Sequence, residues 1–65
     1  MRKPERLYGF YSELQRIHIA YFSDLRFGQF CMSLFSWIQA TKGIDPFFVE
    51  ESKMLDYLHE YANEV

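Results

Sequence analysis

Residues 24–42, DLRFGQFCMSLFSWIQATK, contain the longest uncharged run of this 65-residue chain. Within them large apolar side chains recur at steps of three and four residues, which is the spacing of one face of an α-helix. These side chains are Phe27, Phe30, Cys31, Leu34, Trp37 and Ile38. Met32 and Phe35 widen the apolar arc beyond that of a one-sided surface helix, so we expect a central, largely covered helix. Gly43 after Lys42 predicts where it ends, because glycine readily takes the left-handed conformation that closes helices.

Two more helices are predicted, one on each side of the central one. In residues 4–22, which Pro4 opens, the expected buried stripe comprises Leu7, Phe10, Tyr11, Leu14, Ile17, His18 and Tyr21. In residues 49–63 the expected buried positions are Met54, Leu55, Leu58, Tyr61 and Ala62, with Val65 just beyond them. Asp24 is a suitable N-cap for the central helix, with Ser23 as an alternative. The pattern predicts an all-α, three-helix bundle-like fold with short turns.

The connection before the third predicted helix has its own signals. Asp45-Pro46 favours a turn, because the residue before a proline is pushed out of helical geometry. Phe47 and Phe48 follow it, and we expect them to fill the connection as a hydrophobic plug. A chain of 65 residues supports only one core, so residues 1–65 are predicted to form a single domain.

The cysteine content predicts that the protein works in a reducing compartment. Cys31 is the only cysteine, so no disulfide can form within the chain, and a cytoplasmic location is expected. The N-terminal residues lack the apolar core of a signal peptide. The uncharged run is about three-quarters of the ~20 residues that a membrane-spanning helix needs, so no membrane association is expected.

The residues that carry chemistry are few and scattered. No metal-binding spacing links Cys31, His18 and His59, and no glycine-rich phosphate loop is present. We expect His18 to be half-buried and bonded to a carbonyl or a tyrosine, His59 to be solvated, and Cys31 to lie in the core. An enzyme would need a pocket that joins a histidine to an acidic residue or to Cys31. The sequence therefore predicts a protein that is not an enzyme and has no catalytic residue, cofactor or metal.

Charge is distributed unevenly along the chain. Residues 1–33 carry five basic and three acidic groups, whereas residues 34–65 carry two basic and six acidic groups. This asymmetry favours pairing of the first helix with the third, or with a neighbouring molecule. Nucleic-acid binding through the basic face of the first helix is the alternative function, and it would depend on Arg2, Lys3, Arg6 and Arg16. The acidic third helix argues against that alternative.

Aromatic residues are unusually frequent. Seven Phe, five Tyr and one Trp are more than three short helices easily cover, which favours a subunit or partner interface. We therefore expect a small protein-interaction module that forms a homodimer or binds another protein. The predicted contact residues are Tyr8, Tyr11, Arg26, Gln29, Phe35, Trp37 and Phe47. For Arg26 and Gln29 a structural role is the alternative, with Arg26 paired to a carboxylate and Gln29 capping loop carbonyls.

Two short motifs support a family resemblance. Asp24-Leu25-Arg26-Phe27-Gly28-Gln29, followed by Asp45-Pro46-Phe47-Phe48 and Glu50-Glu51, resembles a group of small uncharacterised bacterial and phage proteins with the core PDLRxGQ…DPFYxED…L. The resemblance spans roughly residues 7–60. This sequence differs in having Ser23, Phe48 and Glu51 where proline, tyrosine and aspartate are common. The resemblance implies a compact helical protein, often encoded in mobile or phage-like regions, and supplies no catalytic residue.

Overall fold

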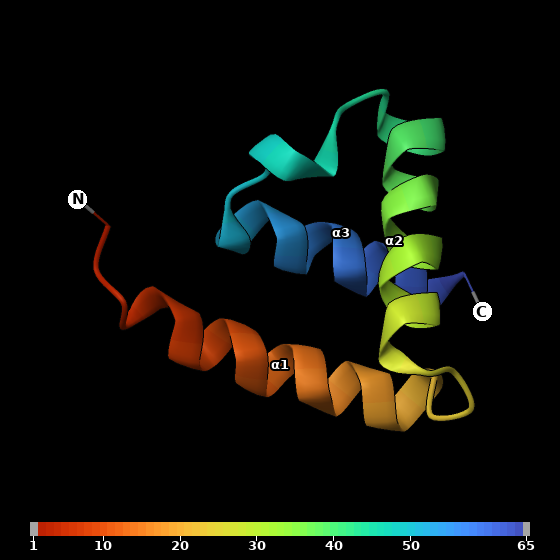
Figure 1. Ribbon diagram of the computed structural model, residues 1–65, viewed down its shortest axis with the longest axis horizontal. Coiled ribbons are helices and arrows are strands. Elements are labelled where there is room, and N and C mark those ends of the chain that lie inside the picture. Colours follow the sequence, from red (N-terminus) through yellow and green to blue (C-terminus); the bar gives the residue numbers. More distant parts are fainter. Residues whose placement is uncertain (1, 65) are drawn as a thin grey trace.

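The chain folds into three α-helices and one short 3-10 helix, and the computed structural model describes residues 2–64 (Figure 1). The α-helices are α1 (Arg6–Tyr21), α2 (Phe27–Lys42) and α3 (Glu51–Asn63), and the 3-10 helix η1 (Pro46–Phe48) lies between α2 and α3. No strand occurs among the described residues. The predicted all-α, three-helix fold is therefore confirmed.

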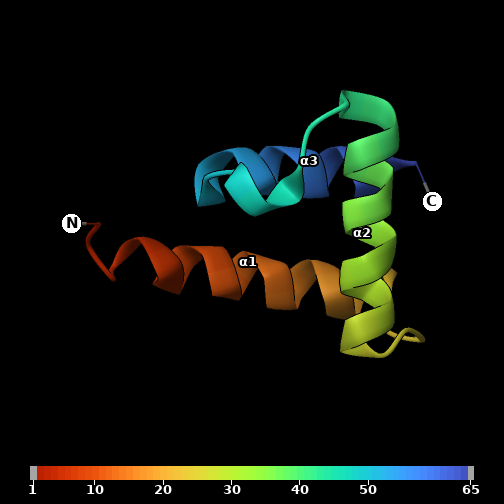
Figure 2. The ribbon, with the colours of Figure 1, turned by 45° about the horizontal axis from the view of Figure 1, so that its top comes forward.

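Helices α1 and α3 lie side by side and run in the same direction, and α2 crosses one end of this pair steeply (Figures 1 and 2). The same direction is possible because residues 43–50, which include η1, carry the chain back from the far end of α2 toward the start of α1. Helix α3 packs against both α1 and α2. The helix expected to be central and largely covered, α2, is only partly covered, since its Met32 is 73% exposed.

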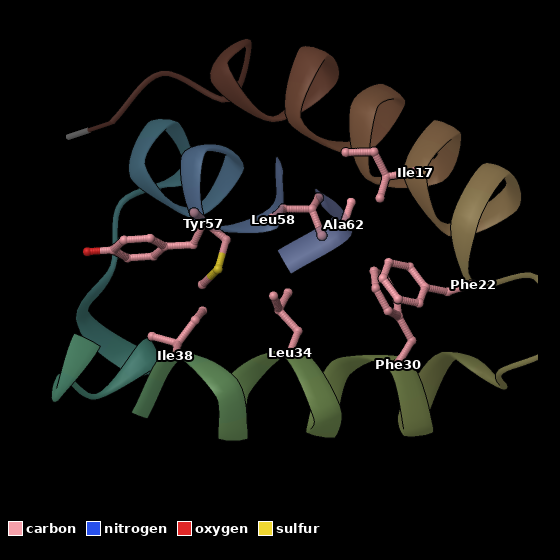
Figure 3. Close-up of a cluster of buried hydrophobic side chains, with 9 residues drawn as sticks. Ile17, Phe22, Phe30, Leu34, Ile38, Tyr57, Leu58 and Ala62 are labelled. Atoms are coloured by element: carbon pink, nitrogen blue, oxygen red, sulfur yellow. The ribbon is translucent and has the colours of Figure 1, made fainter. Parts of the chain in front are cut away.

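The core lies where the three helices meet (Figure 3). Helix α2 contributes three side chains at successive turns, α3 contributes four, α1 contributes one, and the turn after α1 adds a phenylalanine. These residues are Ile17, Phe22, Phe30, Leu34, Ile38, Met54, Tyr57, Leu58 and Ala62. Neither Phe22 nor Tyr57 was predicted from the periodicity. Phe22 lies just beyond the end of α1 and stacks between Phe30 and Tyr61, with ring centres 5.1 and 5.2 Å away.

The start of α2 differs from the prediction. The helix begins at Phe27 and not at residue 24, and its N-cap is Arg26, in extended geometry, rather than Asp24 or Ser23. The side-chain oxygen of Gln29 accepts a hydrogen bond of 2.9 Å from the Arg26 backbone N–H. Phe22 is buried in the core just after α1, and residues 23–25 form the turn that follows it. These residues therefore cannot form the first turn of α2.

The other boundaries shift by one or two residues. Helix α1 begins at Arg6 instead of residue 4, because Pro4 and Glu5 form a turn before it. Helix α3 begins at Glu51 instead of residue 49, since Glu50 is extended and serves as N-cap. The predicted contact of Val65 lies outside the described residues.

The hydrophobic plug predicted in the connection does not form. Phe47 is 83% exposed and Phe48 is 76% exposed. Pro46 begins the single turn of η1 and the Asp45 carboxylate accepts a hydrogen bond of 3.0 Å from the Phe47 N–H. This turn carries both rings outward, and Val49 is the residue of this segment that packs against the core.

Candidate protein-interaction surface

Polar side chains line the contact between α1 and α3. Arg6 Nε lies 2.9 Å from Glu51 Oε1, and His59 Nε2 lies 3.0 Å from Glu13 Oε2. Arg2, just before α1, pairs with Glu50. The charge asymmetry of the sequence is thus used within one molecule, to join the basic first helix to the acidic third one.

Two carboxylates of this contact have perturbed acidities. The Arg16 guanidinium, whose Nη2 is 2.7 Å from Glu13 Oε2, lowers the pKa of Glu13, and His59 lowers it further. Arg6 lowers the pKa of Glu51 through its hydrogen bond. Both carboxylates are therefore held in the charged form that the pairs need.

The corner between α1 and α2 is, in contrast, apolar and open. It holds a cavity of about 190 Å³ whose ten lining residues are all uncharged. Met54 and Leu58 of α3 form part of its lining, and residues of α1 and α2 complete it. They are Phe10, Tyr11, Leu14, Phe27, Phe30, Cys31, Leu34 and Phe35. We call this cavity the α1–α2 hollow.

Two shallower hollows continue the apolar surface. Tyr11 also lines a hollow with Leu7 and Tyr8 along the first turns of α1. Phe35 also lines a hollow with Pro46 and Phe47 beside η1, at whose edge the charged Asp45 lies. Tyr11 and Phe35 thus make these two hollows direct neighbours of the α1–α2 hollow.

We call the exposed rings of this surface the aromatic face. Its members are Tyr8, Tyr11, Phe27, Phe35 and Phe47. With about 200 Å² for each fully exposed ring-bearing side chain, their exposed fractions amount to roughly 600 Å². That area is at the upper end of the largest apolar patches on ordinary monomers, about 300–600 Å².

Four of the seven predicted contact residues lie on the aromatic face, namely Tyr8, Tyr11, Phe35 and Phe47. Phe27 was missed as a surface residue, because its helical phase assigned it to the core. It is the first residue of α2, where the neighbouring helices no longer cover it, and it is exposed. Its place in the first turn of the predicted helix was the signal available in the sequence.

Trp37 does not join the aromatic face. Its ring packs against Tyr61, with centres 5.3 Å apart, and its Nε1 donates a hydrogen bond of 3.1 Å to Glu64. Lys42 Nζ lies 5.6 Å from the centre of the same ring and 2.8 Å from Glu60, and this carboxylate raises the pKa of Lys42. Trp37 thus helps to join α2 to the end of α3.

The remaining two predicted contact residues, Arg26 and Gln29, lie at the exposed start of α2. Gln29 has a capping role, although it accepts a bond from a backbone N–H and does not donate to loop carbonyls as expected. No other part of the chain approaches Gly28 between them, because no atom lies within 4 Å of the position of an added Cβ.

The basic residues named for nucleic-acid binding are largely engaged. Arg2, Arg6 and Arg16 each pair with a glutamate, as described above. A phosphate would have to compete with these carboxylates for the same guanidinium groups. This arrangement weakens the case for the nucleic-acid alternative.

His18 and Cys31 have separate structural surroundings. His18 Nε2 is 2.9 Å from the Leu25 carbonyl oxygen, so the expected carbonyl bond is confirmed. Cys31 is half-buried at the edge of the α1–α2 hollow, and burial raises the pKa of its thiol. Within residues 2–64 no three His, Cys, Asp or Glu side chains form a group suited to a metal ion.

None of the helices described is both long enough and apolar enough to cross a membrane. No family model, no curated protein and no solved structure matches this chain. The resemblance to small bacterial and phage proteins therefore stays a prediction.

Proposed function

We propose that this protein is a small interaction module that self-associates through its aromatic face. The observation that carries the proposal is the α1–α2 hollow, an uncharged cavity flanked by exposed rings. Tyr and Phe are the residue types that interface centres favour, and charged residues are depleted there. The aromatic face has this composition.

Size also favours self-association. One partner contributes about 800 Å² to a standard interface, and the aromatic face alone accounts for roughly 600 Å². Polar residues that line the two shallower hollows, such as Ser12, Gln15 and Gln39, would supply the remaining area as a polar rim. A domain this small gains rather little from its own core, so burial of this face in a dimer would add substantially to its stability.

Sedimentation equilibrium from micromolar to millimolar concentration tests the proposal. We expect an average mass that rises from the monomer value of 7.9 kDa toward twice that value. Tyr11→Lys should shift the equilibrium toward monomer, because it places a charge on the aromatic face. Tyr21→Lys is the matched control, since Tyr21 is a similarly exposed tyrosine of α1 that lines none of the three hollows. A wild-type protein that stays monomeric throughout would contradict the proposal.

A further inference from the structure

We propose that the occupant of the α1–α2 hollow is the Phe47 ring of a second copy of this chain, inserted reciprocally in a twofold dimer. This inference rests on the proposed self-association and specifies its geometry. It is carried by the size of the hollow, the exposure of Phe47 and the position of Phe35 between them.

The hollow has the size and lining that a phenyl ring needs. Its volume is about 190 Å³, and a protein cavity of about 150 Å³ lined by Leu, Ile and Phe accommodates benzene. All of its lining residues are uncharged, so an entering ring removes no charged group of the hollow itself from water. The hollow is thus suited to an aromatic side chain and poorly suited to a polar one.

Phe47 is the exposed ring best prepared to enter such a hollow. Its side chain is the most exposed of the large apolar residues. Its backbone is held by Pro46 at the start of η1 and by the hydrogen bond from its N–H to Asp45. A ring on a fixed turn loses little conformational entropy when it binds, which favours affinity.

The position of Phe35 allows each copy to insert its Phe47 ring into the hollow of the other. Phe35 lines both the α1–α2 hollow and the hollow that contains Phe47, so it lies between the ring and its receiving site on one surface. In a twofold dimer the same patch of each copy meets the other. An axis near Phe35 brings each Phe47 to the partner's hollow and the two Phe35 rings toward each other.

Phe48 provides a matched control. It is the next residue of η1 and is exposed to a similar degree, but it lines neither the α1–α2 hollow nor the hollow beside η1. We expect Phe47→Ala to raise the dimer dissociation constant at least about 30-fold and Phe48→Ala to change it by less than about threefold. Because both side chains are exposed, both variants should keep the helical circular dichroism of the wild type.

A complementation experiment tests the reciprocal arrangement directly. Phe47→Ala removes the ring but leaves the hollow, whereas Cys31→Phe fills the hollow but leaves the ring. At a concentration just high enough to make the wild type dimeric, neither variant should form homodimers to a large extent, yet their mixture should form a heterodimer with one intact contact. Native mass spectrometry distinguishes the heterodimer from both homodimers by mass.

Chemical cross-linking supplies a second measurement if Cys31→Phe does not fold. Phe47→Cys in the otherwise natural chain also lacks the ring, so it is tested at millimolar concentration, where a weakened dimer still forms. A short bis-maleimide should then join the new thiol to Cys31 of the second copy, in a product of twice the monomer mass on a denaturing gel. The same change combined with Cys31→Ser should lose that cross-link, as peptide mapping would show.

The outcomes separate this inference from the proposed function. A wild-type monomer at millimolar concentration overturns both. A dimer that is unaffected by Phe47→Ala, or that cross-links elsewhere, overturns the insertion of Phe47 but retains self-association. A monomer whose hollow residues shift in NMR spectra when a phenylalanine-containing peptide is added would show that the hollow takes a foreign ring instead.

Discussion

His18 joins the end of α1 to the turn that follows it. Its Nε2 bonds to the Leu25 carbonyl oxygen at 2.9 Å, and its ring stacks on Phe30 with the centres 4.7 Å apart. Because a carbonyl only accepts hydrogen bonds, Nε2 must carry the hydrogen. A single imidazole thus holds the turn and covers part of the core.

His18→Ala is expected to lower the free energy of unfolding by about 1.5–3 kcal/mol, since it removes both a hydrogen bond and packed ring atoms. Urea denaturation followed by circular dichroism measures this change. His59→Ala is the control, because it removes only an exposed pair with Glu13 and should lower the free energy of unfolding by less than about 1 kcal/mol. Equal effects of the two substitutions would contradict the structural role assigned to His18.

At the scale of the helices, two glycines have opposite roles. Gly43 closes α2 with φ at +67° and donates its N–H to the Gln39 carbonyl at 3.1 Å. Gly9 lies inside α1, with no atom within 4 Å of the position of an added Cβ.

Gly43→Ala should destabilise the protein by about 1–2 kcal/mol, because alanine is strained at a positive φ. Gly9→Ala should stabilise it by about 0.5–1 kcal/mol. Thermal unfolding of the two variants beside the wild type measures both signs, and a stabilising Gly43→Ala would contradict the assignment.

The helices were predictable from the sequence because each has its own apolar period. The start of α2 was not, since Ser23 and Asp24 have good capping chemistry and only the burial of Phe22 shows why they are not used. Periodicity also identifies a helix face without showing how much of it a neighbour covers. Tyr11 shows this, because the periodicity predicted it to be buried on α1 and the excess of aromatic residues predicted it to be a contact residue. It is exposed, and it lies on the aromatic face.

Two carboxylates near the contact between α1 and α3 give the protein a pH dependence with a defined sign. Arg16 lowers the pKa of Glu13, and Arg6 lowers that of Glu51, from the usual 4.5. The unfolded chain therefore takes up protons at a higher pH than the folded one. The stabilisation is complete above the usual value and is lost as the pH falls through the lower folded values.

The free energy of unfolding in urea should accordingly fall between about pH 5 and about pH 3. The double variant Glu13→Gln, Glu51→Gln removes both titrating groups, so its stability should change less over the same interval. Identical slopes for the wild type and the double variant would show that these two pairs do not cause the pH dependence.

At the scale of the whole molecule, the proposed self-association would couple folding to dimer formation. A single core of this size rarely contributes more than about 3–5 kcal/mol, so burial of the aromatic face in a dimer would be a large addition. A partner present at 100 times the dissociation constant adds about 2.7 kcal/mol to the stability of the folded state.

The melting temperature should therefore depend on protein concentration. Each kcal/mol shifts Tm by about 4–8 °C in a domain of this size, so we expect Tm to be roughly 10–20 °C higher well above the dissociation constant than below it. Differential scanning calorimetry across that concentration range measures the shift. Phe47→Ala should flatten the dependence and keep the low-concentration Tm, because its ring is exposed in the monomer. A wild-type Tm that is independent of concentration would mean that the monomer is stable with its aromatic face in water, and self-association would no longer be needed to explain the fold.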